Sequence, residues 1–332
     1  MKRLLAAALT ALLSTAAAPS WAAEITPAVS FDMGGKLDKS FNESVHNGAE
    51  AFTRATGVAV REFEVQNASQ REQALRNFAR RGQTPIIAVG FNQATAVKAV
   101  AAEFPALHFV IIDSVTDAPN VQSIVFREEQ GSYLAGMIAA LRSGTGKVGF
   151  VGGMDVPLIR KFACGYAEGA RAVNPKVEVL QNMTGSTPSA WADPVRGAEL
   201  ARSQIERGAD VVLHAAGATG IGVLQAAADA GKFGIGVDSN QNALHPGRVL
   251  TSMVKQLDVA TRTTLDAARG GTWKPGTTVL GLAEGGVGLA FDASNASAVT
   301  PEMKGRIEAA SADIVAGRTV VHDYMSNNAC PN

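Results

Sequence analysis

Three aspartates that each follow a short apolar run are the residues with the clearest chemical potential. Asp32 follows "AVSF", Asp113 follows "FVII" and Asp238 follows "GIGV". A carboxylate accepts hydrogen bonds from hydroxyl and ring N–H groups, and open parallel sheets bind ligands beyond the carboxyl ends of their strands. A single aspartate there can instead cap the next helix. Three of them together favour a ligand-binding cleft.

Aromatic residues in polar segments add a second kind of chemistry. Phe41 lies in "DKSFNES" and Trp191 in "PSAWADP", in a chain with only three tryptophans and three tyrosines. Stacking a base on an aromatic side chain contributes about 1–3 kcal/mol. Two structural roles remain open, because Phe41 can staple the helix that follows it and Trp191 can cap the helix beginning near Asp193.

Several enzyme and metal signatures are absent from the sequence. "GATGIG" (217–222) lacks the spacing of a dinucleotide-binding turn, and no Gly-x-Ser-x-Gly elbow occurs. The five histidines stand singly, without metal-ligand spacing. We therefore expect a binding protein with no cofactor, no metal ion and no catalytic residue.

Composition excludes other classes of partner. The 332 residues are 46% hydrophobic and 18% charged, with 30 basic and 30 acidic side chains and a formal net charge of zero. Binding to nucleic acid or to an anionic membrane surface requires a basic patch. The balanced charge therefore indicates neither a nucleic-acid partner nor a membrane-surface partner. The hydrophobic content is sufficient for a large folded core.

The N-terminus has the features of an export signal. Lys2 and Arg3 precede an apolar stretch from Leu4 to Leu13, and the small residues around Ser20 and Ala22 fit a cleavage site. The apolar stretch is shorter than the roughly 20 residues that span a bilayer. We predict a signal peptide over residues 1–22, with no cysteine beside it for lipid attachment.

The chain has two cysteines, Cys164 and Cys330. In an oxidising compartment a pair of this kind indicates a possible disulfide. Two free buried thiols are the alternative.

Short β-branched runs alternate with helix-length segments along the whole chain, as in "PIIAVG" followed by residues 93–103. This pattern is typical of parallel strands buried on both faces. The fold class is therefore α/β, with two Rossmann-like lobes joined by a hinge of short crossings near residues 126, 253 and 289. We expect lobe 1 to comprise residues 23–127 plus 253–288, and lobe 2 residues 128–252 plus 289–332.

Seven blocks in order resemble the basic membrane protein family of ABC-transporter substrate-binding proteins. They are "DMGGKLDKSFNES", "IIDS", "GSYLAGMIAAL", "GKVGFVGGMDVPLIRKFACGYAEGA", "AGATGIGVLQAA", "IGVDSNQ" and "TSMVKQLDVA". The best-understood branch of that family comprises purine nucleoside receptors with the two-lobed periplasmic-binding-protein fold. The resemblance implies a receptor that delivers a purine nucleoside to an inner-membrane permease and its ATPase.

The resemblance also implies roles for single residues. Phe41, with Asn42 beside it, matches the aromatic that stacks on the purine, and Asp32 matches the acid that begins the same motif. Asp113 matches a carboxylate at the base edge. The remaining matches are the ribose-holding pair, the glycine-rich turn and two candidates for the second wall: Asp238, Lys255, Gly217, Trp191 and Met154.

Two departures widen the range of expected ligands and set the expected location. The segment "NMTGSTPSAWADP" differs from the shorter loop of the nucleoside receptors, so a free base or another heteroaromatic ligand is an alternative. A secreted nucleoside hydrolase that uses Asp32 or Asp113 to activate water is a second alternative. Many relatives are lipoproteins, whereas this chain predicts a freely diffusing periplasmic monomer that is not inserted in the membrane.

Overall fold

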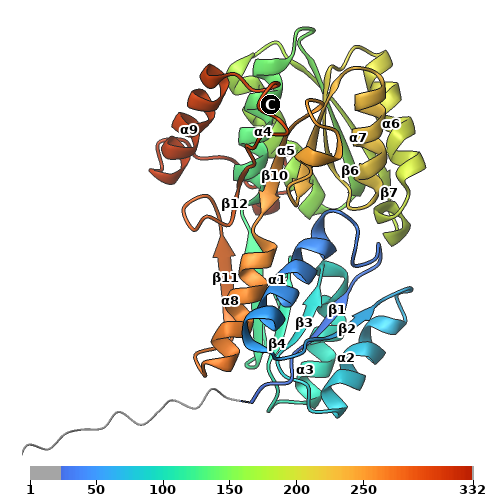
Figure 1. Ribbon diagram of the computed structural model, residues 1–332, viewed down its shortest axis with the longest axis vertical. Coiled ribbons are helices and arrows are strands. Elements are labelled where there is room, and N and C mark those ends of the chain that lie inside the picture. The colour runs from blue at the N-terminus through green and yellow to red at the C-terminus, as the bar shows by residue number, and fades with distance from the viewer. Residues whose placement is uncertain (1–23, 331–332) are drawn as a thin grey trace, which may run out of the picture.

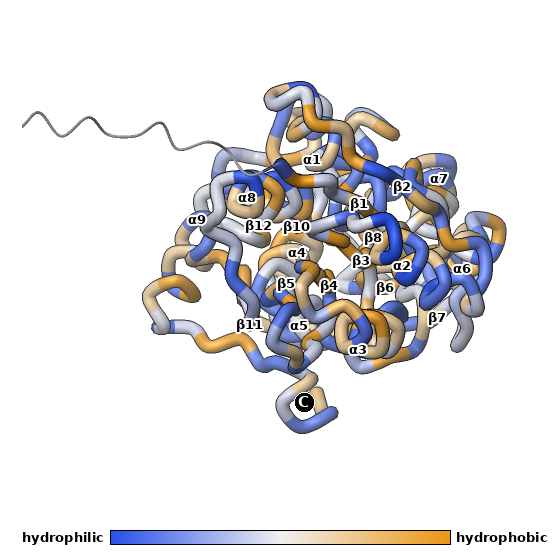
Figure 2. Tube along the Cα trace, turned by 90° about the horizontal axis from the view of Figure 1, so that it is seen from below, coloured by the Kyte–Doolittle hydropathy of each residue, from blue (hydrophilic) through white to orange (hydrophobic). Residues whose placement is uncertain are grey.

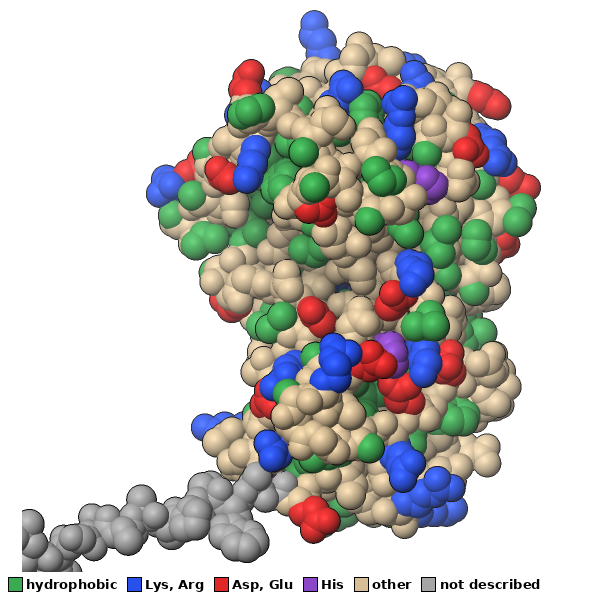
Figure 3. Space-filling model, viewed as in Figure 1, with side chains coloured by type: hydrophobic (Ala, Val, Ile, Leu, Met, Phe, Trp, Pro, Cys, Tyr) green, Lys and Arg blue, Asp and Glu red, His purple; other side chains and the backbone are tan. Residues whose placement is uncertain are grey.

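A computed structural model describes residues 24–330 and shows two lobes, one above the other, each built on a six-stranded sheet (Figure 1). This confirms the predicted α/β class with two parallel-sheet lobes. The surface narrows between the lobes, and acidic and basic side chains are interspersed on the face shown in Figure 3. The predicted signal peptide, residues 1–22, lies outside the described residues.

Lobe 1 contains a fully parallel sheet with strand order β11-β5-β4-β3-β1-β2. Strands β1, β3 and β4 are buried along their whole length, as expected for strands covered on both faces. Helices α1 and α8 pack on one face, and α2 and α3 on the other. The bounds are β1 Ala28–Phe31, α1 Phe41–Thr56, β2 Arg61–Glu64, α2 Gln70–Arg80, β3 Ile86–Val89, η1 Phe91–Gln93, α3 Ala94–Glu103, β4 Phe109–Ile112, β5 Val121–Phe126, α8 Leu257–Arg269 and β11 Gly276–Leu280.

Lobe 2 contains the second sheet, with strand order β12-β10-β9-β8-β6-β7 and only β12 antiparallel to its neighbour. Its helices α4 and α5 approach closely, because Gly136 lies against the backbone of Tyr166 and leaves no space for a Cβ atom. The bounds are α4 Glu128–Arg142, β6 Lys147–Met154, α5 Pro157–Val173, β7 Glu178–Gly185, η2 Pro188–Trp191, α6 Pro194–Glu206, β8 Val211–Ala215, α7 Thr219–Asp229, β9 Phe233–Asp238, η3 Asn242–Leu244, β10 Val249–Lys255, β12 Val287–Leu289, α9 Pro301–Val315 and η4 Tyr324–Ser326.

The core of each lobe lies between its sheet and the helices that cover it. Seen from the lobe 1 end, hydrophobic segments of the sheets are flanked by helices of mixed hydropathy (Figure 2). Side chains alternate along β1, since Val29 and Phe31 face α1 and α8 whereas Ala28 faces the helices on the other side. The carboxyl ends of β1, β3 and β4 therefore carry the residues that follow them to one edge of the sheet.

The chain crosses between the lobes three times, from β5 to α4, from β10 to α8 and from β11 to β12. Residues 253–255 pair within the second sheet as the end of β10, and residues 287–288 pair there as part of β12. The boundaries expected between 252 and 253 and between 288 and 289 are thus displaced by a few residues. The cause is that β10 pairs on both sides and stays extended as far as Lys255.

The C-terminal segment is attached to lobe 2 by covalent and polar contacts. Cys164 in α5 is bonded to Cys330, with the two Cα atoms 5.5 Å apart. In the same segment the backbone N–H of His322 donates to Glu168 Oε2 at 3.1 Å. The tail is therefore held against α5 at two points.

Candidate ligand-binding site

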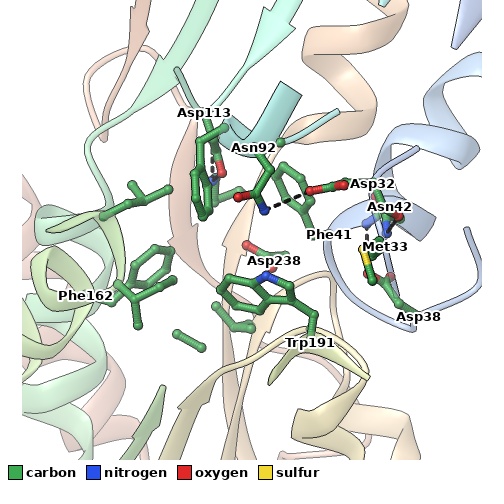
Figure 4. A pocket seen from close by; sticks show the side chains of 18 residues that line it. Asp32, Met33, Asp38, Phe41, Asn42, Asn92, Asp113, Phe162, Trp191 and Asp238 are labelled. Atoms are coloured by element: carbon green, nitrogen blue, oxygen red, sulfur yellow. Dashed lines mark hydrogen bonds and ion pairs between the residues drawn. The ribbon is translucent and has the colours of Figure 1, made fainter. Parts of the chain in front are cut away.

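A pocket lies between the lobes, where the strand ends of both sheets meet (Figure 4). Eight of the nine ligand-binding residues predicted from the sequence line it: Asp32, Phe41, Asn42, Asp113, Trp191, Gly217, Asp238 and Lys255. Lobe 1 contributes the loop after β1 and the ends of β3 and β4. Lobe 2 contributes η2, the ends of β8 and β9, and Lys255 at the end of β10.

Met154 is the exception, because it does not line this pocket. Strand β6 continues as far as Met154, which pairs with Gly185 of β7 and is buried. Instead, the first turns of α5 supply that part of the wall through Leu158, Ile159 and Phe162. Their apolar helical spacing is typical of core residues, so the sequence carried no signal of pocket lining.

Further lining residues lie outside that set of nine. Gly90 and Phe91 follow the predicted strand "PIIAV", so the strand-end rule names both, and Asn92 comes directly after them. Met33 and Asp38 lie in the loop after β1 and also line the pocket.

Asp32 lies in a polar group made entirely by lobe 1. Its Oδ1 accepts a hydrogen bond from Arg71 Nε at 3.0 Å, and its Oδ2 accepts one from Asn92 Nδ2 at 2.9 Å. The amide of Asn42 donates to the Asp32 carbonyl at 3.3 Å. Asp32 does not cap α1, because the Asp38 carboxylate accepts the backbone N–H groups of that turn. Asp32 and Asn92 therefore form one polar end of the pocket.

Lys255 organises the other polar end. Its Nζ lies 2.7 and 2.6 Å from the two Asp113 carboxylate oxygens and 3.0 Å from Glu128 Oε1. Glu128 is paired in turn with Lys161 at 3.0 Å, so a chain of buried charges leads from the pocket to the start of α4. Asp238 also lines this part of the pocket, and its Oδ2 accepts a hydrogen bond from Ser40 Oγ at 3.0 Å.

Both carboxylates at this end occupy an uncommon backbone conformation, with φ of 65° at Asp113 and 63° at Asp238. Residues other than glycine rarely adopt this left-handed backbone conformation, and those that do are often found at functional sites. Each residue turns the chain sharply at the carboxyl end of its strand. The turn leaves the carboxylate in the cleft between the two lobes.

Burial sets the protonation of this group. It raises the pKa of Asp113 to about 7 against the opposing effect of Lys255, and it raises the pKa of Asp238 to about 6. Burial alone would lower the pKa of Lys255, but Asp113 and Glu128 outweigh it and hold that pKa above its usual value. The lysine is therefore a permanent cation, while the two aspartates gain protons in mild acid.

Aromatic rings occupy the space between the polar ends. Lys255 Nζ lies 5.1 Å from the centre of the Phe41 ring, and the edge of the ring also approaches Gly90, next to Asp32. Trp191 makes an edge contact with Phe91, with ring centroids 6.4 Å apart and planes at 73°. Trp191 does not cap α6, since the Asp193 side chain accepts the backbone N–H of Arg196. The rings of both lobes thus face a common space (Figure 4).

The Trp191 ring lies against Gly153, where a Cβ atom would collide with the ring, and close to Gly217. Among the described residues, no group of three or more His, Cys, Asp or Glu side chains is arranged to hold a metal ion. No helix between residues 24 and 330 is both long enough and apolar enough to cross a membrane. The pocket offers aromatic surface, acceptors and one ammonium group.

Residues 25–318 match the family model described as Bmp, ABC transporter substrate-binding protein PnrA-like. The chain belongs to the Bmp family of ABC transporter substrate-binding proteins. It is 31% identical over 321 residues to an ABC transporter nucleoside-binding protein, BmpA, of Lactococcus lactis, with 90% of this chain and 89% of the relative covered. It is 33% identical over 281 residues to an uncharacterised lipoprotein of Pyrococcus furiosus, with 80% and 70% covered.

Among solved structures, an ABC transporter solute-binding protein of Aeropyrum pernix matches with a TM-score of 0.82 and 28% identity, over 90% of this chain and 94% of the other. The Bmp family is one of substrate-binding proteins rather than enzymes. Membership implies a small-molecule ligand and a permease partner. A relative called a lipoprotein contrasts with the expectation that this chain is not lipidated, and the segment concerned lies outside the described residues.

Proposed function

We propose that this member of the Bmp family binds a purine nucleoside between its lobes and delivers it to an inner-membrane permease. One observation carries the proposal: the Phe41 ring lines the same pocket as the Asp32–Asn92 group and the Lys255–Asp113 pair, with Lys255 Nζ 5.1 Å from the ring centre. A nucleoside has the same order of parts, because a flat base with polar edges is joined to a sugar with several hydroxyl groups.

In the proposed complex the base stacks on Phe41 with Trp191 as the second wall. The base edge meets Asp32 and Asn92, whose oxygen and amide groups can accept and donate hydrogen bonds. The ribose hydroxyls donate to Asp113 and Asp238. Charge-assisted hydrogen bonds of this kind are about twice as strong as neutral ones.

This arrangement changes one role expected from the sequence. Asp113 was expected at the base edge, but both of its carboxylate oxygens lie within 2.7 Å of Lys255 Nζ. We therefore place Asp113 with Lys255 and Asp238 at the ribose. The name of the Lactococcus lactis relative, a nucleoside-binding protein, supports this class of ligand. We further propose that the mature protein acts in the periplasm as a monomer.

Isothermal titration calorimetry with unfolded and refolded, ligand-free protein tests the assignment. Inosine is compared with hypoxanthine, its free base, for the parent protein, Asp238→Ala and Asp117→Asn, an exposed control on the loop after β4. We expect inosine to bind more tightly than hypoxanthine, and only Asp238→Ala to remove that preference. Equal binding of both compounds by the parent protein would favour uptake of a free base.

A further inference from the structure

We propose that Ser40 of lobe 1 is a positioning residue that holds the Asp238 carboxylate of lobe 2 in its ligand-binding orientation only when the lobes are closed. The inference rests on the proposed function in one respect, namely that Asp238 contacts the ligand. It adds a residue outside the pocket lining that links binding to lobe closure.

Ser40 is fully buried at the junction of the lobes and is bound by lobe 2 through both its side chain and its backbone. Its hydroxyl group lies 3.0 Å from Asp238 Oδ2 and 3.2 Å from the Val237 carbonyl oxygen. In the opposite direction, Ser239 Oγ donates to the Ser40 carbonyl at 2.7 Å. These contacts, which we call the Ser40 contact, join segments about 200 positions apart in the sequence.

The lobe 1 side of the Ser40 contact is held in place by its own loop. Asp38 Oδ1 accepts the backbone N–H of Ser40 at 2.8 Å, and Lys39 adopts a left-handed φ of 61°. Such strain persists where the surrounding structure fixes it. The residue after Ser40 is Phe41, so the proposed stacking ring and the Ser40 contact move together.

The lobe 2 side is fixed by Gln241. Its amide donates to the Lys39 carbonyl at 2.9 Å, while its Oε1 receives the Val237 N–H at 2.9 Å and lies 2.8 Å from Nε2 of the buried His214. Burial lowers the pKa of His214 to about 4, so the ring is neutral and Nε2 donates. A preset partner on each side means that closing the lobes orders few further groups.

The consequence for Asp238 concerns its two oxygens. Ser40 occupies Oδ2, and among the described residues no hydrogen bond is made to Oδ1. One oxygen is therefore directed by lobe 1 while the other is left for a donor in the pocket. Opening the lobes removes the Ser40 hydroxyl, so a ligand meets a fixed acceptor only in the closed state.

The charged groups around Asp238 determine in which direction its pKa changes when Ser40 is replaced. Burial raises the pKa of Asp238 to about 6, with smaller contributions from Asp38 and Glu128, against the lowering effects of Lys255 and the Ser40 hydrogen bond. Asp113 is a further acidic neighbour. Removing the Ser40 hydroxyl leaves Lys255 as the main stabiliser of the carboxylate, so the pKa of Asp238 rises further.

The experiment compares inosine affinity as a function of pH for Ser40→Ala, Ser239→Ala and a control, Ser69→Ala, at an exposed position before α2. We expect Ser40→Ala to weaken binding about tenfold or more at pH 7.5, in line with the loss of a hydrogen bond to a charged group. The acid limb of its affinity profile also moves to higher pH. Ser239→Ala should weaken binding without moving the acid limb. Ser40→Thr, which keeps a hydroxyl group, should restore the parent affinity and acid limb. Ser69→Ala should change neither the affinity nor the acid limb.

A folded Ser40→Ala protein with parent affinity and an unmoved acid limb would overturn the proposal. Its thermal midpoint, measured alongside, shows whether the variant is folded. Failure of the proposed function gives a different result, in which the parent protein binds no inosine at any pH. In inosine-saturated protein labelled with ¹³C at aspartate, the Asp238 carboxyl should titrate at higher pH in Ser40→Ala than in the parent protein, and an unchanged titration would refute the role of Ser40.

Discussion

Replacing Lys255 by methionine should destabilise the ligand-free protein strongly and in a pH-dependent way. Lys255 is 2% exposed, and Asp113 lies 2.6 Å from its ammonium group. Glu128 keeps a second cation, Lys161, at 3.0 Å, so most of the cost falls on Asp113. Removing one partner of a buried ion pair costs about 3–5 kcal/mol. We expect a loss of that order in the free energy of unfolding at pH 7.5.

The sign of the pH dependence follows from the pKa of Asp113. Burial already raises it above the value of an unfolded aspartate, to about 7, and loss of Lys255 raises it further. A carboxyl group with a raised pKa in the folded state contributes most stability below its unfolded pKa and loses it as pH rises through the folded pKa. The penalty of Lys255→Met should therefore shrink as pH falls from 7.5 toward 5.

Urea unfolding at pH 5 and pH 7.5 measures both effects. Adding Asp113→Asn to Lys255→Met removes the unpaired charge, so the double variant should be more stable than the single variant at pH 7.5. Lys304→Met is the matched control, because its pair with Glu308 is exposed and contributes about 0–1 kcal/mol. An equal loss at both pH values, or a double variant less stable than the single one, would refute the reasoning.

Three further outcomes follow from the pocket and the tail. Phe41→Ala should weaken nucleoside binding by about 1–3 kcal/mol in calorimetry, with Phe41→Trp as the control that keeps a stacking surface; unchanged affinity would remove Phe41 from the site. Gly153→Ala should displace the Trp191 ring and weaken binding while the fold stays intact by circular dichroism, because a Cβ atom there collides with the ring. Replacing Cys164 and Cys330 by serine should lower the free energy of unfolding by about 2–4 kcal/mol, and reductant should then destabilise only the parent protein.

The fold could be predicted because its signal is local. Strands such as Ile86–Val89 are short β-branched runs buried on both faces, and helix-length segments separate them. The same regularity located the pocket, since the ends of parallel strands meet at one edge. Asp32, Asp113 and Asp238 all lie where that rule places them.

What the sequence could not supply is which groups pair inside the pocket. Lys255 meets Asp113 across 142 positions, and Arg71 reaches Asp32 across 39. The Lys255–Asp113 contact depends on how the lobes close, and both contacts depend on side-chain reach, which no local pattern encodes. The resemblance implied a base-edge role for Asp113, and no local pattern indicated that its carboxylate lies against Lys255.

The apolar residues that line the pocket could not be recognised from the sequence for a different reason. Phe162 belongs to an amphipathic helix whose apolar face also fills the core of lobe 2. Its spacing is that of any buried helix. Phe162 is buried and lines the pocket as well as the core, so no local pattern separates the two roles.

Calorimetric titration of the ligand-free protein with adenosine, guanosine and inosine tests the central claim most directly. We expect one-to-one binding of at least one of the three, accompanied by an upward shift of the thermal midpoint, as for any ligand that binds only the folded state. Absence of both heat and thermal shift with all three nucleosides, in protein shown to be folded, would contradict it.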